Sequence, residues 1–124
     1  MPPPIRLPVQ VWHSADVVAA VRHWKAEARG GRGAESRTSA QRLKELARLE
    51  AILERKPFFG RNVPKNLIPS RLAAQGIANL FRNDLPDGWR MLHTFIEVDS
   101  LQVAYILAVM SHEDYDKLFG YRGR

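Results

Sequence analysis

The stretch that decides the fold runs from Asn79 to Tyr121 and reads NLFRNDLPDGWRMLHTFIEVDSLQVAYILAVMSHEDYDKLFGY. Its apolar residues come close to alternating with polar ones, a spacing typical of strands. The three expected strands cover residues 80–85, 89–97 and 101–110. Turn-forming residues separate them at Pro86-Asp87-Gly88 and at Val98-Asp99-Ser100. Three strands joined by such short connections predict an antiparallel meander.

The N-terminal part of the chain predicts two helices, because its apolar residues recur at helical spacing. Ser14 is a favourable N-cap for a first helix that ends near Arg29. A second helix is expected from Ser39 to Lys56, since Pro57 follows and cannot continue it. The two helices are expected to form a hairpin and to bury their apolar stripes against one face of the sheet.

Shorter elements complete the expected fold. A strand near residues 9–12, a loop over 58–69, a helical turn over 71–76 and a final helix over 113–118 follow from local composition. The predicted class is α+β, an N-terminal helical hairpin packed on an antiparallel β-sheet with a short C-terminal helix or tail. The 124 residues are expected to form one domain, with residues 1–8 as an exposed, proline-rich arm.

Composition excludes several classes of protein. The chain contains no cysteine, so disulfides and thiolate metal sites are excluded. The longest apolar run, Val103 to Met110, is too short to span a bilayer, and no membrane partner is expected. The N-terminus lacks the pattern of a signal peptide, which predicts a cytoplasmic protein.

Positive charge is concentrated in the first part of the chain. Residues 1–75 contain fourteen basic and six acidic side chains, whereas residues 76–124 contain five basic and seven acidic ones. No acidic residue occurs between Arg55 and Asn83, a segment with six cations. Such a segment attracts a polyanion or an acidic protein partner. A solvated basic surface without a partner is the alternative interpretation.

Several short motifs occur in a characteristic order along the chain. Gly88-Trp89-Arg90-Met91-Leu92 opens one predicted strand, and another ends in Ser111-His112 with a tyrosine close behind. Ile68-Pro69 precedes them and Phe119-Gly120-Tyr121 follows. In order and spacing, these motifs resemble the RelE/ParE superfamily of toxins from type II toxin–antitoxin systems, in its archaeal-type RelE-like branch. The resemblance covers roughly residues 9–121 and implies a RelE-like fold.

The resemblance is compatible with more than one function, each with its own partners. Toxins of the RelE branch are endoribonucleases that cut mRNA on the ribosome, whereas ParE toxins share the fold and inhibit DNA gyrase without a comparable nuclease site. Either kind implies a cognate antitoxin protein as partner. A RelE-fold interaction module without toxicity is the third hypothesis. Family membership alone does not decide between them.

The expected catalytic residues follow from the chemistry of metal-independent RNA cleavage. His112 suits proton transfer, because the unperturbed pKa of histidine is about 6.5. Arg90 suits a phosphate, because its guanidinium binds two oxygens and stays charged. Tyr121 and Tyr115 can stack on a base or donate a hydrogen bond. Arg82 is the one cation in the strand where RelE has paired lysines. An ion pair of Arg90 with Asp84 or Glu97 is the alternative interpretation of that arginine.

Five further basic residues are expected to contact RNA. They are Arg61, Lys65, Arg71, Arg122 and Arg124. No spacing of histidines and acids suggests a metal site, and no glycine-rich phosphate loop is present, so no metal or cofactor is expected. His93 is interpreted as a structural residue.

Overall fold

The structure is a computed structural model, and it describes residues 4–120. Its main elements are β1 (Gln10–His13), α1 (Ala15–Arg29), α2 (Ala34–Arg55), β2 (Arg61–Asn62), α3 (Ser70–Ala73), β3 (Phe81–Leu85), β4 (Trp89–Val98), β5 (Leu101–Met110) and α4 (His112–Phe119). Single 3-10 turns, η1 (Lys65–Leu67) and η2 (Pro86–Gly88), lie between them. The α+β class predicted from the sequence is confirmed.

The sheet has five strands in the order β1-β5-β4-β3-β2. The meander β3-β4-β5 is antiparallel as predicted, and β2 adds an antiparallel pair at one edge. At the other edge β1 runs parallel to β5, with Gln10 opposite Val103. The prediction of a purely antiparallel sheet is therefore wrong, and the sheet is mixed. The helical hairpin and the first two strands of the meander come between β1 and β5 in the sequence. Strand β5 then lies beside β1 and runs in the same direction as β1.

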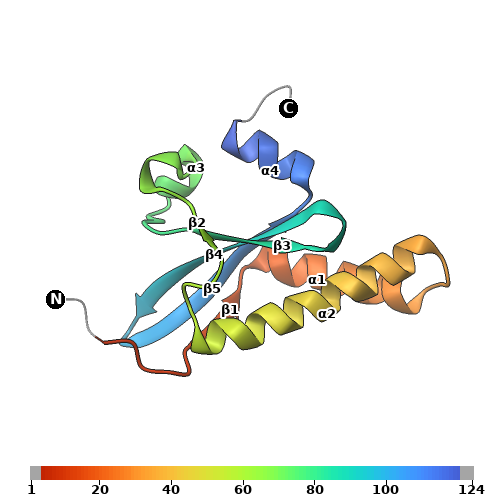
Figure 1. Ribbon diagram of the computed structural model, residues 1–124, viewed down its shortest axis with the longest axis horizontal. Coiled ribbons are helices and arrows are strands. Elements are labelled where there is room, and N and C mark those ends of the chain that lie inside the picture. The colour runs from red at the N-terminus through yellow and green to blue at the C-terminus, as the bar shows by residue number, and fades with distance from the viewer. Residues whose placement is uncertain (1–3, 121–124) are drawn as a thin grey trace.

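The helical hairpin lies on one face of the sheet (Figure 1). Helix α1 has the predicted bounds, because the Ser14 side chain accepts a hydrogen bond from the Val17 amide at its start. Helix α2 begins at Ala34, earlier than the predicted Ser39. Ser39 lies inside the helix and is buried, and its hydroxyl donates to Glu27 Oε1 at 2.7 Å.

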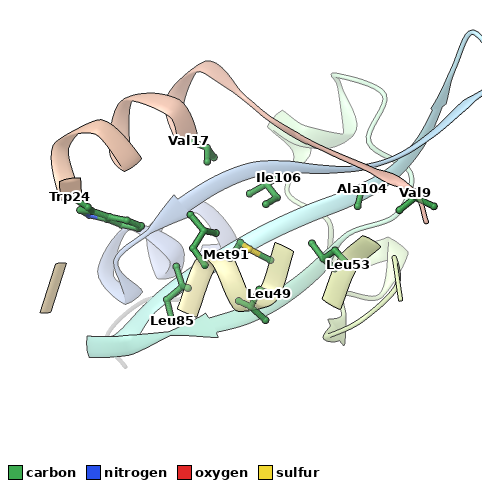
Figure 2. Packing of buried hydrophobic residues seen from close by; sticks show 10 residues of the cluster. Val9, Val17, Trp24, Leu49, Leu53, Leu85, Met91, Ala104 and Ile106 are labelled. Atoms are coloured by element: carbon green, nitrogen blue, oxygen red, sulfur yellow. The ribbon is translucent and has the colours of Figure 1, made fainter. Parts of the chain in front are cut away.

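The main core lies between the hairpin and the sheet (Figure 2). The rings of Trp24 and Trp89 meet edge to face there, with centroids 5.3 Å apart. Ten buried residues form this cluster: Val9, Val17, Trp24, Leu46, Leu49, Leu53, Leu85, Met91, Ala104 and Ile106. Burial of these side chains is what holds α1 and α2 on the sheet.

A second, smaller core lies on the opposite face, under α3 and α4 (Figure 1). Its buried members are Val63, Ile68, Leu72, Leu80, Leu92 and Tyr115. Helix α4 begins at His112, because the Ser111 side chain accepts a hydrogen bond from the Asp114 amide. It ends at Gly120, which adopts the left-handed conformation (φ 75°). The helix predicted over residues 113–118 is thus confirmed, slightly longer than expected.

The segment predicted as a loop over residues 58–69 contains β2, which pairs with the start of β3. Gly60 has φ +118°, and a Cβ atom there would lie 2.6 Å from Asn83 Nδ2. Glycine therefore allows the loop to approach β3 closely. Within residues 4–120, no helix is long and apolar enough to cross a membrane.

Candidate functional site

Two arginines and one carboxylate meet on the sheet face that α4 covers. Arg82 and Asp84 project from the same face of β3, and Arg90 lies opposite Asp84 on β4. The Nε atoms of Arg82 and Arg90 are each 3.5 Å from the same oxygen, Asp84 Oδ1. Asp84 is 65% exposed, so one largely solvated carboxylate is shared by two cations.

Tyr115 places an aromatic ring next to both cations. The Arg82 guanidinium lies 5.5 Å from the ring centroid and that of Arg90 lies 5.9 Å from it. These distances are typical of cation–π contacts. Tyr115 is only 5% exposed and its ring stacks on Phe119 at 4.3 Å. The tyrosine therefore fixes the two guanidinium groups from α4 and is itself largely hidden from solvent.

His112 and Arg90 both contact Gly88, in the turn between β3 and β4. Arg90 Nη1 donates to the Gly88 carbonyl at 3.0 Å. Gly88 has φ +74°, and a Cβ atom built there would lie 3.1 Å from His112 Nδ1. The His112 side chain is 53% exposed, with Nε2 3.9 Å from Glu113 Oε1. The imidazole thus lies at the surface next to Gly88, whose carbonyl Arg90 binds, and is accessible to a ligand.

The candidate site is defined by these five side chains: Arg82, Asp84, Arg90, His112 and Tyr115. Within residues 4–120, the buried Nε atoms of Arg82 and Arg90 have no hydrogen-bond partner. Their contacts with Asp84 are ion pairs at 3.5 Å without hydrogen-bond geometry. Two positive charges against one carboxylate leave a net positive charge, which suits an anionic ligand such as a phosphate.

The predicted site residues do not all lie together. Arg82 and Arg90 meet at Tyr115, and His112 lies at Gly88, which Arg90 also binds. The ion pair of Arg90 with Asp84, the alternative interpretation of that arginine, is present as well. Arg61 lies opposite Arg82 in the β2–β3 pair, close to the site. Tyr121, Arg122 and Arg124 lie outside the described residues.

Two of the predicted RNA contacts lie elsewhere. Lys65 is exposed on η1, which precedes α3. Arg71, on α3, lines a separate hollow of about 510 Å³ together with Leu118 of α4 and Met110 of β5. These two cations flank the second core rather than the candidate site.

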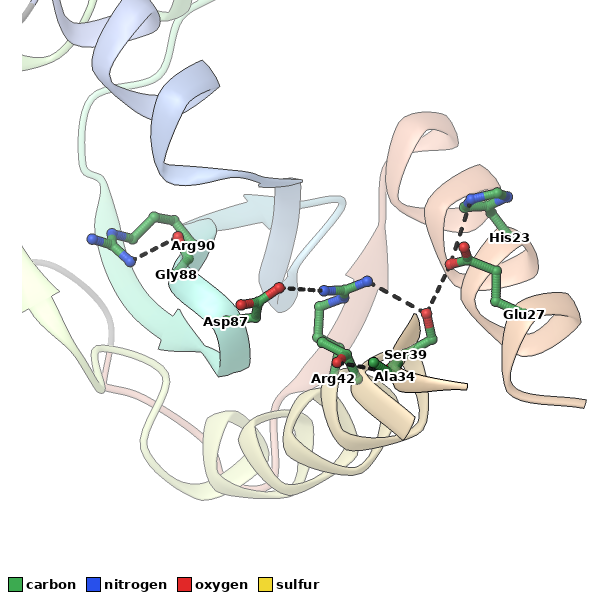
Figure 3. A network of polar contacts seen from close by, with 9 residues as sticks. His23, Glu27, Ala34, Ser39, Arg42, Asp87, Gly88 and Arg90 are labelled. Atoms are coloured by element: carbon green, nitrogen blue, oxygen red, sulfur yellow. Dashed lines mark hydrogen bonds and ion pairs between the residues drawn. The ribbon is translucent and has the colours of Figure 1, made fainter. Parts of the chain in front are cut away.

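Arg42 is a buried residue that the sequence analysis missed. Its guanidinium lies over two indole rings, 5.1 Å from the Trp24 centroid and 4.8 Å from that of Trp89. Arg42 Nη1 is 3.8 Å from Asp87 Oδ2, and Nη2 donates to Ser39 Oγ at 3.4 Å (Figure 3). Through Asp87, Arg42 connects α2 to the turn that carries Gly88. The signal for Arg42 was its place in the apolar stripe of α2, where a charged residue is unusual.

The other histidines do not belong to the site. His93 is fully buried, stacks on Phe81 at 5.1 Å and donates from Nε2 to the Pro57 carbonyl at 2.8 Å, as expected of a structural residue. Burial lowers the pKa of His93 below its usual value, an effect that the hydrogen bond to Pro57 opposes. His13 pairs with Glu50, and His23 with Glu27. In the described part of the chain, no group of three histidines or acids is placed to hold a metal ion.

Comparison of the chain with protein-family models, curated proteins and solved structures finds no match. The resemblance to RelE-like toxins therefore stays a hypothesis based on motifs. The site's own geometry carries the functional argument.

Proposed function

We propose that the chain is a metal-independent endoribonuclease, the toxin of a type II toxin–antitoxin system that acts on mRNA at the ribosome. The observation that carries the proposal is the convergence of Arg82, Arg90 and His112 around Tyr115 and Gly88. The site combines two cations for a phosphate with an exposed imidazole for proton transfer. An antitoxin protein is the partner that such a toxin requires.

The proposed reaction uses the 2′-hydroxyl of the RNA as nucleophile. Its oxygen forms a bond to the neighbouring phosphorus while the bond from phosphorus to the 5′-oxygen breaks. The products are a 2′,3′-cyclic phosphate and a 5′-hydroxyl end. A base accepts the proton of the 2′-hydroxyl and an acid donates one to the departing oxygen.

Four residues of the candidate site, together with Tyr121, have roles in this reaction. Arg90 and Arg82 bind the phosphate oxygens, whose negative charge increases in the transition state. His112 transfers one proton. Tyr121 is the candidate for the second proton transfer or for stacking on a base. Tyr115, largely buried, orients the two guanidinium groups by its ring contacts.

Asp84 is the residue that supports a second candidate function. Its carboxylate is paired with both arginines, so a bound phosphate has to share them with Asp84 or displace it. A site whose arginines stay paired would bind a protein rather than cleave RNA. The alternative function is accordingly a toxin that inhibits a protein target such as DNA gyrase, or a non-toxic interaction module.

Cleavage kinetics on mRNA bound to ribosomes, with a metal chelator present, test the proposal. General acid–base groups contribute about 10²–10⁴-fold, so His112→Ala should slow cleavage by that order. Arg90→Ala should cost at least as much. His23→Ala, which removes an exposed histidine of α1, is the matched control. Wild-type rates in folded His112→Ala and Arg90→Ala proteins would contradict the mechanism.

A further inference from the structure

A hollow of about 580 Å³ lies next to the candidate site, along β3 where β2 begins. Its lining includes aromatic rings and charged side chains. The lining residues are Phe58, Phe59, Gly60, Arg61, Arg82, Asn83 and Asp84. Arg82 and Asp84 also belong to the candidate site, so the hollow and the site share these two residues. We call it the Phe59 hollow.

The two phenylalanines are exposed although large apolar side chains are usually buried. Phe58 is 47% exposed and Phe59 is 36% exposed. Phe58 packs against Phe81 and Phe95, with ring centroids 5.6 Å and 5.0 Å away. Its position is therefore fixed by the sheet while almost half of its surface is still accessible.

The backbone that carries Phe59 is also fixed. The Phe59 amide donates to the Lys56 carbonyl at 3.0 Å, and the Phe59 carbonyl accepts from Asn83 Nδ2 at 3.1 Å. Gly60 allows this approach, because a side chain there would collide with Asn83. The aromatic surface is consequently pre-organised, which lowers the entropy lost when a ligand stacks on it.

The charge of the Phe59 hollow indicates the kind of ligand. Arg61 lies opposite Arg82 in the β2–β3 pair, and Asp84 is the one acid among the lining residues. Because Asp84 is already paired with Arg82 and Arg90, the positive charge of Arg61 is left uncompensated within the hollow. Exposed aromatic rings combined with arginines are how proteins bind single-stranded nucleic acid, since each nucleotide offers a flat base and a phosphate.

We propose that the Phe59 hollow is a subsite for one nucleotide of single-stranded RNA, next to the nucleotide whose phosphate Arg90 holds. The base stacks on Phe59 and Arg61 contacts the phosphate of this nucleotide, while Arg82 stays with Arg90 at the neighbouring phosphate that is cleaved. The subsite rests on the proposed function and specifies its substrate class as unpaired RNA. Only an unpaired base is free to stack on an aromatic side chain of the protein.

Binding of an RNA that cannot be cleaved tests the subsite. The probe is a fluorescent 2′-O-methyl oligoribonucleotide of about eight nucleotides, within the length that such sites cover. Phe59→Ala should weaken its binding by roughly 5- to 100-fold, the range that stacking on an aromatic ring gives. Phe59→Tyr should bind like the wild type. Leu67→Ala, which removes another exposed apolar side chain, should leave binding unchanged.

An abasic oligomer of the same length separates stacking from charge. Phe59→Ala should bind it as well as the wild type does, whereas Arg61→Ala should bind it more weakly and with a smaller dependence on salt. Unchanged affinity of Phe59→Ala and Phe59→Leu for the base-containing probe would overturn the subsite while leaving the proposed function standing. A wild-type protein that binds neither oligomer, or that binds an acidic peptide instead, would also overturn the subsite, whereas the proposed function is overturned by intact mRNA in the ribosome assay.

Discussion

Acidification should destabilise the protein through His93. Its side chain is fully buried, and burial holds its pKa below the unfolded value of about 6.5. As the pH falls, the unfolded chain therefore takes up a proton at this position before the folded protein does. The stability contributed by neutral His93 is fully present above pH of about 6.5. It is lost as the pH falls below that value towards the folded pKa.

The size of this effect follows from linkage. One proton bound only by the unfolded state costs at most about 1.4 kcal/mol per pH unit. Between pH 6.5 and 5, His93 should therefore account for up to about 2 kcal/mol of lost stability. No acid of the described residues stabilises the charged ring in the folded protein. Among the same residues, His93 Nδ1 has no hydrogen-bond partner, and Nε2 donates to the Pro57 carbonyl.

Urea denaturation at pH 7 and pH 5 measures the effect. The wild type should lose more stability between the two values than His93→Gln, whose side-chain amide can still donate to the Pro57 carbonyl. His23→Gln, on the surface of α1, should retain the wild-type loss. Equal losses in wild type and His93→Gln would show that His93 is not the group whose protonation destabilises the protein.

Two further substitutions test the fold. Arg42→Ala should destabilise the protein by about 2–4 kcal/mol in thermal or urea denaturation, because it leaves a cavity and removes two desolvated cation–π contacts. Arg48→Ala, at an exposed position of the same helix, should be about as stable as the wild type. Equal stabilities of the two variants would contradict the role given to Arg42. Gly60→Ala should cost more than Gly76→Ala in the same assays: both glycines have positive φ, but only at Gly60 does the new methyl group meet Asn83. Equal costs would show that the approach to β3 is not tight.

Local signals explain why much of the fold was predictable. Ser14 caps α1, and the turn at residues 86–88 separates β3 from β4. In both places the residues at the boundary themselves determine where the element begins or ends. The start of α2 was missed by five residues, and only the structure shows that Ser39 lies inside the helix with its hydroxyl bonded to Glu27 on the neighbouring helix. The direction of β1 was also missed, since an alternating pattern is the same in parallel and antiparallel strands.

The site was predictable in part for the same reason. Arg90 and His112 were expected to meet because both lie at strand ends, and the structure brings both to Gly88. The sharing of Asp84 by two arginines depends on the register of β3 with β4, which the sequence does not specify. The Phe59 hollow was missed because its aromatic residues lie in a loop with no periodic pattern, held in place by a contact with β3.

Primer extension on cellular mRNA, after induced production of the protein in a bacterial host, tests the claim that the protein cuts mRNA. New mRNA ends should appear within translated regions for the wild type, and far fewer for His112→Ala produced at the same level. Intact mRNA in cells that contain folded wild-type protein would contradict the claim. If growth nevertheless stopped, the function would belong to the alternative in which the toxin binds a protein target.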